Sequence, residues 1–189
     1  KAVPGLNAAF INVGHEKDGF LHYHDLGPKF PSLLKYIKQV STGKNKDFLL
    51  KQFQFEKDID KDGNVGEVLS PKQTVLVQVI KEPISTKGPR LSSEISLAGR
   101  FMVLMPFSDR VSISQKIEDR AEKSRLKKLV QSIRPKGFGL IIRTVAEGQK
   151  VAALDADIQQ LLTRWKNLSV KLKQIDQFPT KVLSEINRS

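Results

Sequence analysis

The sequence predicts an α+β fold, with a small β-barrel in the first half of the chain followed by a compact α+β unit that ends in a long helix. Short runs of β-branched and aromatic residues separated by turn residues fill the first half, and the second half alternates strand, helix, strand and helix. We expect the boundary near Pro83–Pro89, which gives domains at residues 1–87 and 88–189.

In the first half, residues 6–24 predict two short strands joined by a turn at Lys17-Asp18-Gly19, and the β-branched run Thr74–Lys81 predicts another strand. Residues 56–68 are expected to form an acidic loop. A helix is predicted between residues 24 and 56, because apolar residues recur at helical spacing at Leu33, Leu34, Ile37 and Val40. The first half therefore consists mainly of strands around one helix.

In the second half we predict a strand over residues 101–105, a hairpin-like return through Val111–Ile113, a helix over 118–132, a strand over 138–145 and a long helix over 149–177. The apolar positions of the long helix are Leu154, Ile158, Leu161, Trp165, Leu168, Leu172 and Ile175. These positions are separated alternately by four and three residues, which is typical of a coiled-coil seam. We favour instead that this face of the helix packs against the chain's own sheet or a further domain.

Composition excludes several classes of protein. The chain has 189 residues, of which 39% are hydrophobic and 28% charged, and no apolar run reaches the ~18 residues that a membrane span needs. The opening residues lack the apolar region of a signal peptide. The absence of cysteine excludes disulfides, thiolate zinc sites and a cysteine nucleophile, and it fits a cytoplasmic protein.

Charge is unevenly distributed along the chain. The 32 Lys and Arg residues outnumber the 20 Asp and Glu residues, so the net charge is +12 and predicts an anionic partner. Residues 1–87 carry 13 Lys and no Arg against 10 acidic residues, whereas residues 88–189 carry 19 basic residues, including all nine Arg, against 10 acidic ones. Because the arginine fork suits phosphate, the second half is expected to grip a specific phosphate.

Two phenylalanines are candidates for binding bases. Phe10 and Phe20 fall on the two predicted strands beside glycines, with Lys17 between them. Exposed aromatic rings on an OB-type barrel stack the bases of single-stranded nucleic acid. A phenylalanine in a strand is more often a core residue, so from the residues alone both interpretations stay open.

Arg143-Thr144 is a candidate phosphate site. The pair ends an apolar strand and precedes Ala146-Glu147-Gly148 and a helix start. A guanidinium, a hydroxyl and free backbone N–H groups at such a turn are expected to form a cup for phosphate, although a surface arginine after a strand is also common.

Other polar patterns do not predict chemistry. Asp58–Gly63 follows the D-x-D-x-D-G start of a calcium loop, but Leu69 stands at the twelfth position where a bidentate acid is required, so a solvated turn is predicted. His22 and His24 share a strand face, but a zinc site needs at least a third ligand, so ordinary strand histidines are favoured. Phosphate-loop, zincin and hydrolase-elbow motifs are absent, and we predict no catalytic centre and no metal site.

Several segments, in order, resemble the ribonuclease E/G family. They are Ala8–Gly14, Gly19-Phe20-Leu21, Lys87-Gly88, Ile95–Pro106, Ser114-Gln115-Lys116-Ile117 and Gly139–Thr144. The resemblance covers nearly the whole chain and is closest to the bacterial ribonuclease G branch. It implies an OB-fold RNA-binding domain, whose first strand the chain enters partway, followed by a 5′-sensor subdomain.

The resemblance also implies roles for individual residues. Phe10 and Phe20 match aromatics that stack RNA bases, and Lys87 matches a lysine that contacts RNA. Residues that match the pocket for a 5′-monophosphate are Gly99, Val103, Arg143 and Thr144. Gln115 stands where the family often has arginine, which implies a weaker pocket unless Lys116 substitutes.

For the whole protein, the resemblance implies a magnesium-dependent endoribonuclease, a hydrolase that cleaves single-stranded RNA in processing and decay. In the family, magnesium is bound by a downstream nuclease domain, and zinc at a dimer interface beyond it. We therefore expect this chain to be a fragment of a homo-oligomeric parent, inactive by itself, with no cofactor of its own. Two alternatives are an RNA-binding or ribosome-associated OB-fold module without a nuclease, and a protein scaffold that acts through the Leu154–Ile175 seam.

Overall fold

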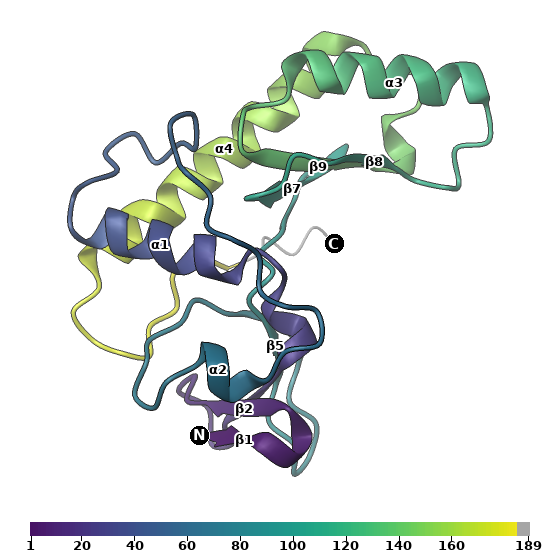
Figure 1. The fold of residues 1–189 in the computed structure, drawn as a ribbon. Helices are drawn as coiled ribbons and strands as arrows, with labels where there is room; N and C mark the ends of the chain where they lie inside the picture. The colour runs from purple at the N-terminus through teal and green to yellow at the C-terminus, as the bar shows by residue number, and fades with distance from the viewer. Residues whose placement is uncertain (185–189) are drawn as a thin grey trace. The chain divides into compact units, whose positions relative to one another are not determined.

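The computed structural model describes residues 1–184, and its architecture is α+β, which confirms the predicted fold class (Figure 1). The chain forms two compact units. Unit 1 comprises Lys1–Lys44, Glu56–Ile95 and the chain from Val170 onward, and unit 2 comprises Asn45–Phe55 and Ser96–Ser169. Both units are discontinuous in sequence, so their bounds differ from the predicted domains 1–87 and 88–189. That residues 1–87 bind RNA bases and residues 88–189 bind the 5′ end stays a prediction.

Unit 1 is built on a five-stranded sheet with the strand order β1-β2-β3-β5-β4. The strands are β1 (Ala2–Val3), β2 (Ala8–Ile11), β3 (Gly19–His22), β4 (Gln78–Lys81) and β5 (Arg90–Ser92). Neighbours pair antiparallel, except for β3 and β5, which run parallel. The sheet is consistent with an OB-type fold, but within residues 1–184 it stays open and does not close into the predicted barrel.

The strand pair β2–β3 separates a core face from an outer face. Ala9 pairs with Leu21 and both are buried, whereas Phe10 pairs with Phe20 and both are half-buried. Successive strand side chains point to opposite faces, so this alternation places the two rings opposite the core. The core face packs with residues of η2 (Tyr23–Leu26), α1 (Phe30–Ser41), α2 (Val65–Val68) and β5, among them Tyr23, Leu26, Phe30, Val65 and Leu91.

Two local predictions for unit 1 need correction. The strand predicted over Thr74–Lys81 is ladder-paired only from Gln78, because the Leu76 carbonyl accepts a hydrogen bond from the Ser93 hydroxyl (3.0 Å) in place of a strand neighbour. The acidic loop over residues 56–68 ends in the one-turn helix α2, where the Asn64 side chain accepts a hydrogen bond from the Gly66 amide and the Asn7 side chain accepts one from the Val65 amide.

Unit 2 contains a four-stranded sheet with the order β6-β7-β9-β8. The strands are β6 (Leu97–Ala98), β7 (Met102–Pro106), β8 (Val111–Ile113) and β9 (Phe138–Ile142). The predicted hairpin-like return through Val111–Ile113 is wrong: β8 pairs parallel with β9, while β7 pairs antiparallel with the other edge of β9.

The connection from β7 to β8 crosses β9 at Gly139. A Cβ atom at this glycine would lie 2.6 Å from Ser108 Oγ and 2.8 Å from the Arg110 carbonyl oxygen, so no larger residue fits there. The same carbonyl accepts a hydrogen bond from the amide of Leu140 (2.9 Å). The close crossing at a glycine therefore places β8 on the far side of β9.

Two helices complete unit 2. Helix α3 (Arg120–Ile133) is capped by Asp119, which accepts from the amides of Ala121 and Glu122, and it buries Leu126 and Val130. Helix α4 (Val151–Gln174) buries the first five residues of the predicted seam, namely Leu154, Ile158, Leu161, Trp165 and Leu168. The seam is therefore largely internal, as favoured from the sequence.

Trp165 anchors an early segment of the chain in unit 2. Its fully buried indole donates from Nε1 to the Phe48 carbonyl oxygen (2.9 Å) and lies edge-on to Phe107 and Phe138. Leu50 is also fully buried and lies close to Gly137. No helix among the described residues has the length and apolarity to cross a membrane.

Candidate nucleic-acid interface

Phe10 and Phe20 form a ring pair on the outer face of unit 1. They are directly opposite each other in the β2–β3 register, with ring centroids 5.7 Å apart and ring planes inclined by 66°. Both are half-buried, so neither is a core residue, and each keeps part of its ring open to solvent. The arrangement offers two adjacent aromatic surfaces, which is what base stacking requires.

Lys87 lies near the end of the same strand pair. It is exposed and sits in the tight turn that joins β4 and β5, where its backbone exchanges two hydrogen bonds with Ile84. A Cβ atom on the next residue, Gly88, would lie 2.1 Å from the Asp18 carbonyl, so this turn packs directly on the β2–β3 connection. The amide of Phe20 donates to the Pro89 carbonyl (2.9 Å), which fixes the position of the turn beside the ring pair.

In unit 2, the four residues that match the sensor pocket lie at one end of the sheet. Arg143 is exposed and follows β9 directly, and its Nη1 donates to the carbonyl oxygens of Gly99 (2.7 Å) and Arg100 (3.4 Å). Val103, half-buried on β7, pairs with Ala98 on one side and Ile141 on the other. The fold therefore brings two stretches of chain together at this end of the sheet, one with Gly99 and Val103 and one with Arg143 and Thr144.

A buried aspartate that we did not predict holds the turn between β6 and β7. The Asp157 side chain on α4 accepts three hydrogen bonds of 3.0 Å, from the amides of Arg100, Phe101 and Met102. Asp157 is only 5% exposed. A Cβ atom at Gly99 would lie 2.7 Å from the carboxylate, so glycine is required there by the aspartate. The available sequence signal was an acid three residues after Leu154, on the buried side of the helix.

Asp157 and Arg143 together satisfy nearly the whole backbone of this turn. The aspartate accepts hydrogen bonds from the three amide groups, and the Arg143 guanidinium donates to the Gly99 and Arg100 carbonyls. The Arg143 amide donates to the Phe101 carbonyl (2.8 Å). The turn is closed by a hydrogen bond from the Gly99 amide to the Met102 carbonyl (2.7 Å). The guanidinium is therefore held by backbone carbonyls.

Two hydroxyl groups meet where β8 and β9 end. Thr144 Oγ1 and Ser114 Oγ are 2.8 Å apart and share a hydrogen bond. Ser114 extends β8, because its amide donates to the Ile142 carbonyl (2.8 Å). Gln115 and Lys116, the next two residues, are both exposed. Charged and hydroxyl donors are therefore available at one end of the sheet.

Four of the backbone N–H groups after Arg143, those of residues 146–149, are already bonded within the protein. The amides of Ala146, Glu147 and Gln149 donate to carbonyls of the η3 turn (Thr144–Ala146) and its neighbour, and the Gly148 amide donates to Glu122 Oε1 (2.9 Å). Backbone donors that are already bonded within the protein offer little to a ligand. Among the side chains at this end of the sheet, the Arg143 guanidinium is exposed.

An ion pair on α3 supports the same segment. Glu122 and Arg125 form a bidentate pair, and Arg125 Nη1 also donates to the Gln149 carbonyl (3.0 Å). The hydrogen bonds from Arg125, then from the Gly148 amide, lower the pKa of Glu122 from 4.5 to about 2, and the carboxylate in turn raises the pKa of Arg125. The pair thus fixes residues 148–149, just after the hydroxyl-bearing turn.

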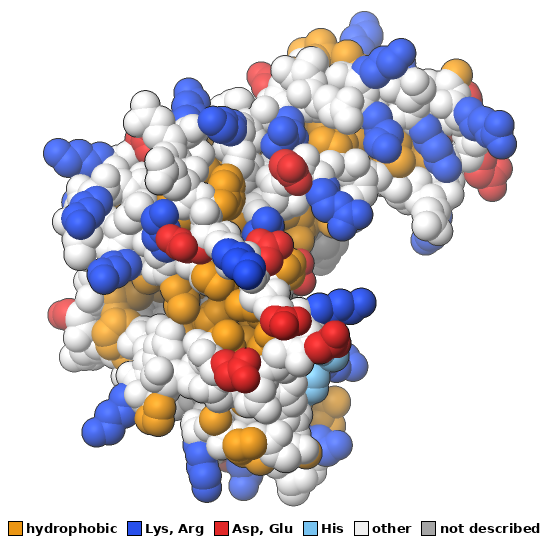
Figure 2. Space-filling view, in the orientation of Figure 1, with side chains coloured by type: hydrophobic (Ala, Val, Ile, Leu, Met, Phe, Trp, Pro, Cys, Tyr) orange, Lys and Arg blue, Asp and Glu red, His pale blue; other side chains and the backbone are white. Residues whose placement is uncertain are grey.

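The surface around α3 is strongly basic. Figure 2 shows blue side chains gathered over α3, which carries Arg120, Lys123, Lys127 and Lys128 in addition to the paired Arg125. Such a surface attracts a polyanion without selecting a sequence.

The described residues do not fit a metal site. Between Lys1 and Ser184 no group of three or more His, Asp or Glu side chains is arranged to hold an ion. In the turn that resembles a calcium loop, Asp58 is paired with Lys29 (2.8 Å) and Asp60 accepts from the amide of Asp62 (3.1 Å). We therefore derive no step through magnesium or zinc.

Known proteins show the relationship of this chain. The model of the ribonuclease E/G family matches residues 96–189. Ribonuclease E of Synechocystis sp. is 37% identical over 98% of this chain and 26% of that protein, and ribonuclease E of Nostoc sp. is 38% identical over 87% and 20%. Ribonuclease G of Escherichia coli is 33% identical over 92% of this chain and 32% of that protein.

The chain therefore spans about a fifth to a third of the length of these relatives. Both branches of the family are represented among them, so the assignment to the ribonuclease G branch stays a prediction. The family match in the second half and the nearly full-length similarity to both enzymes lead to one conclusion. This chain belongs to the ribonuclease E/G family.

Proposed function

We propose that this chain binds single-stranded RNA, holding its bases on unit 1 and its 5′-monophosphate on unit 2, within an endoribonuclease of RNA processing and decay. The observation that carries the proposal is the hydrogen bond from the exposed Arg143 guanidinium to the Gly99 carbonyl, which joins the turn after β6 to the end of β9. The related enzymes are named ribonucleases, which supports RNA as the ligand.

The guanidinium is suited to a terminal phosphate. The two carbonyls that hold Nη1 fix its position, and Nε and Nη2 can then donate to phosphate oxygens as a planar fork. The Thr144 and Ser114 hydroxyls share one hydrogen bond, which leaves one hydroxyl proton for a further bond at this end of the sheet. A 5′-hydroxyl end lacks the charge that the guanidinium recognises, and we expect the bulkier triphosphate end to be poorly accommodated.

On unit 1, Phe10 and Phe20 would stack two bases of the RNA, and Lys87 would contact the RNA backbone. Stacking is tolerant of sequence because every base has an aromatic face. We therefore expect the ring pair to contribute affinity without base selectivity, and the selectivity for RNA ends to come from Arg143.

Hydrolysis is not assigned to the described residues, among which no group of three or more His, Asp or Glu side chains is arranged to hold a metal ion. We propose that this chain binds RNA and that the bond is cleaved by a magnesium-dependent part of a cytoplasmic, homo-oligomeric enzyme. Dependence on zinc would likewise reside outside the described residues.

Fluorescence anisotropy with RNAs that differ only in a 5′-monophosphate or 5′-hydroxyl tests the proposal. We expect tighter binding of the monophosphate RNA, and we expect Arg143→Ala to remove about 1.5–3 kcal/mol of that preference, as for hydrogen bonds to charged groups. Arg134→Ala is the matched control, since this arginine bonds the Phe138 carbonyl, away from the turn. Equal affinity for both RNAs in the wild-type chain would refute the end-sensing role.

A further inference from the structure

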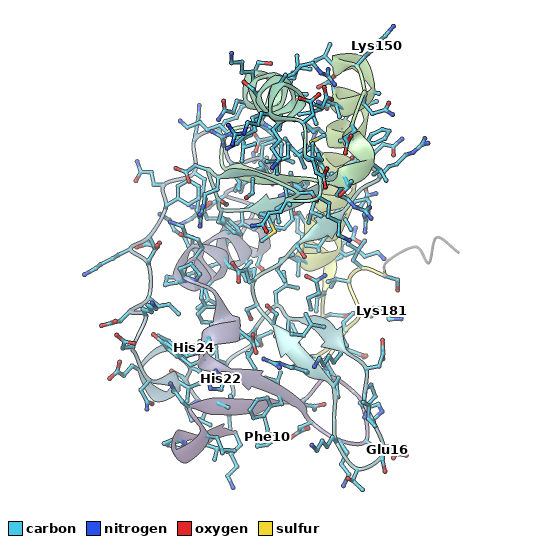
Figure 3. All side chains as sticks on the ribbon, turned by 90° about the vertical axis from the view of Figure 1, so that its right-hand side faces the viewer. Phe10, Glu16, His22, His24, Lys150 and Lys181 are labelled. Carbon is cyan, nitrogen blue, oxygen red and sulfur yellow. The ribbon has the colours of Figure 1, made fainter. Side chains whose placement is uncertain are left out.

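The ring pair of unit 1 is the beginning of a longer aromatic row. The ring centroid of Phe20 is 6.4 Å from that of His22, and the centroid of His22 is 4.9 Å from that of His24. Together with the 5.7 Å contact between Phe10 and Phe20, these distances define the aromatic row Phe10–Phe20–His22–His24. Figure 3 labels Phe10, His22 and His24 on this part of the sheet.

The strand geometry explains why the row lies on one face. Phe20 and His22 are two residues apart on β3 and therefore point to the same side of the sheet. The residue opposite His22 is Ala8, which is fully buried and too small to cover the imidazole. His22 is half-buried and His24 is exposed, so the row continues outward to solvent.

The two imidazoles are oriented by the backbone. His22 Nδ1 accepts a hydrogen bond from the His24 amide (3.1 Å), which caps the η2 turn and holds the first ring. In the neutral imidazole this leaves the proton on Nε2. The His24 ring also lies 6.2 Å from the buried Tyr23 ring, which supports it from behind.

A cation flanks the row. Arg90 on β5 pairs in register with Phe20, and its guanidinium is held by Asp25, the residue after His24 (3.1 Å). The Arg90 side chain is 47% exposed, so it keeps contact with solvent while paired. Sites that bind single-stranded nucleic acid combine aromatic faces for the bases with a nearby cation for the phosphate backbone.

We propose that His22 and His24 extend the base-binding surface of Phe10 and Phe20, so that the row stacks further bases of the same RNA strand. This inference rests on the proposed RNA-binding function of unit 1. The H-x-H pair is not a metal site, since no third ligand accompanies it among residues 1–184. It is not part of the core either, because His22 is half-buried and His24 is exposed.

The test measures binding of 5′-hydroxyl oligoadenylates of four to ten nucleotides by anisotropy, so that recognition of the 5′-phosphate does not contribute. His24→Ala removes the exposed ring. His22→Asn removes the other ring and keeps a side-chain acceptor for the His24 amide, which separates stacking from the cap. For the longer oligomers we expect each variant to lose about fivefold in affinity, the lower end of the range for a stacked base.

His15→Ala is the matched control. His15 also accepts, through Nδ1, from the amide two residues later (Lys17, 3.2 Å), and it is exposed in unit 1, but it belongs to no ring contact among the described residues. We expect this variant to bind like the wild type. The variants His22→Phe and His24→Phe keep a ring, and we expect them to restore the affinity.

Three outcomes decide the inference. A loss that is confined to longer oligomers and rescued by phenylalanine supports it. Unchanged binding by His22→Asn and His24→Ala, while Phe10→Ala and Phe20→Ala still weaken binding, overturns the inference and leaves the proposed function standing. No effect of any ring variant refutes RNA binding by unit 1 as a whole.

Discussion

In unit 1 the proposed RNA surface is a set of rings on a strand pair, whereas in unit 2 it is one guanidinium held by the backbone of a turn. The rings need only the alternation of β2 and β3 and a core behind them. The guanidinium needs a turn whose amides are bonded by a buried carboxylate and whose carbonyls face the arginine. The end-binding surface therefore depends on residues that would never touch RNA.

This difference separates the two surfaces experimentally. Stacking is largely independent of the charge of the RNA end, whereas phosphate contacts are weakened by salt. Ring variants of unit 1 should change affinity for 5′-monophosphate and 5′-hydroxyl strands alike. Variants of unit 2 should change the preference between RNA ends.

The largest effect is expected from Phe10→Ala combined with Phe20→Ala. Each ring is expected to contribute about 1–3 kcal/mol by stacking, so the double variant should lose roughly 2–6 kcal/mol of binding free energy for monophosphate and hydroxyl RNAs equally. Anisotropy titrations at fixed salt measure this. Phe178→Ala, which removes a 63% exposed ring elsewhere in unit 1, serves as the control. If the double variant binds like the control, the rings do not contact RNA.

A smaller effect is expected from Asp157→Asn. The amide keeps the shape of the carboxylate but removes its charge and turns one acceptor into a donor, which faces backbone N–H groups. We expect the free energy of unfolding in urea to fall by about 1.5–3 kcal/mol. The preference for a 5′-monophosphate should fall as well, because the turn also positions Arg143.

Asp155→Asn makes the same change two residues earlier on α4 and is the control for Asp157. Asp155 is half-buried and its carboxylate accepts no hydrogen bond within residues 1–184, so its substitution should alter neither stability nor end preference. Loss of stability with an unchanged end preference in Asp157→Asn would show that the turn does not position the arginine.

Much of unit 1 was predictable because its strands alternate cleanly. The strands that carry Phe10 and Phe20 were predicted from their residues, but whether the two rings face the core or solvent stayed open until the structure showed both half-buried. The strand predicted over Thr74–Lys81 was too long, since it is paired only from Gln78. A β-branched run does not reveal that the Ser93 hydroxyl, and not a neighbouring strand, bonds the Leu76 carbonyl. The openness of the sheet depends on pairings between strands distant in sequence, which local patterns do not encode.

The unpredicted part of unit 2 arises from long-range packing. The parallel position of β8 depends on the crossing at Gly139, and a glycine in a strand indicates a close approach without naming its partner. Asp157 lies 55 to 57 residues from the amides that it bonds, so no local motif contains both. Four of the backbone N–H groups after Arg143, those of residues 146–149, bond to the η3 segment and to Glu122, which only the folded chain shows.

Salt dependence gives a more modest but specific comparison. For monophosphate RNA, Arg143→Ala should reduce the slope of log K against log salt by about 0.7 for each phosphate charge that it no longer neutralises. The Phe10→Ala and Phe20→Ala double variant should shift the line without changing its slope. Titrations at several salt concentrations measure both, and a parallel shift for Arg143→Ala would contradict a direct phosphate contact.

The smallest effect is expected for the ion pair on α3, and it depends on pH. Because the pKa of Glu122 is lowered from 4.5 to about 2 in the folded chain, its stabilising contribution is complete above pH 4.5 and is lost as the pH falls toward 2. The variant Glu122→Gln lacks that contribution at every pH. Urea unfolding should therefore show a less stable variant above pH 4.5, with the two curves converging as the pH falls.

Glu118→Gln removes an exposed carboxylate just before the same helix and controls for the general loss of negative charge. A wild-type chain whose advantage over Glu122→Gln persists unchanged down to pH 2.5 would contradict the role of the carboxylate. Since Glu122 bonds the Gly148 amide and Arg125 bonds the Gln149 carbonyl, the pair stabilises the segment just after Thr144. Acid should thus loosen the end-binding surface of unit 2 through Glu122, while the ring surface of unit 1 contains no carboxylate among its stacking groups.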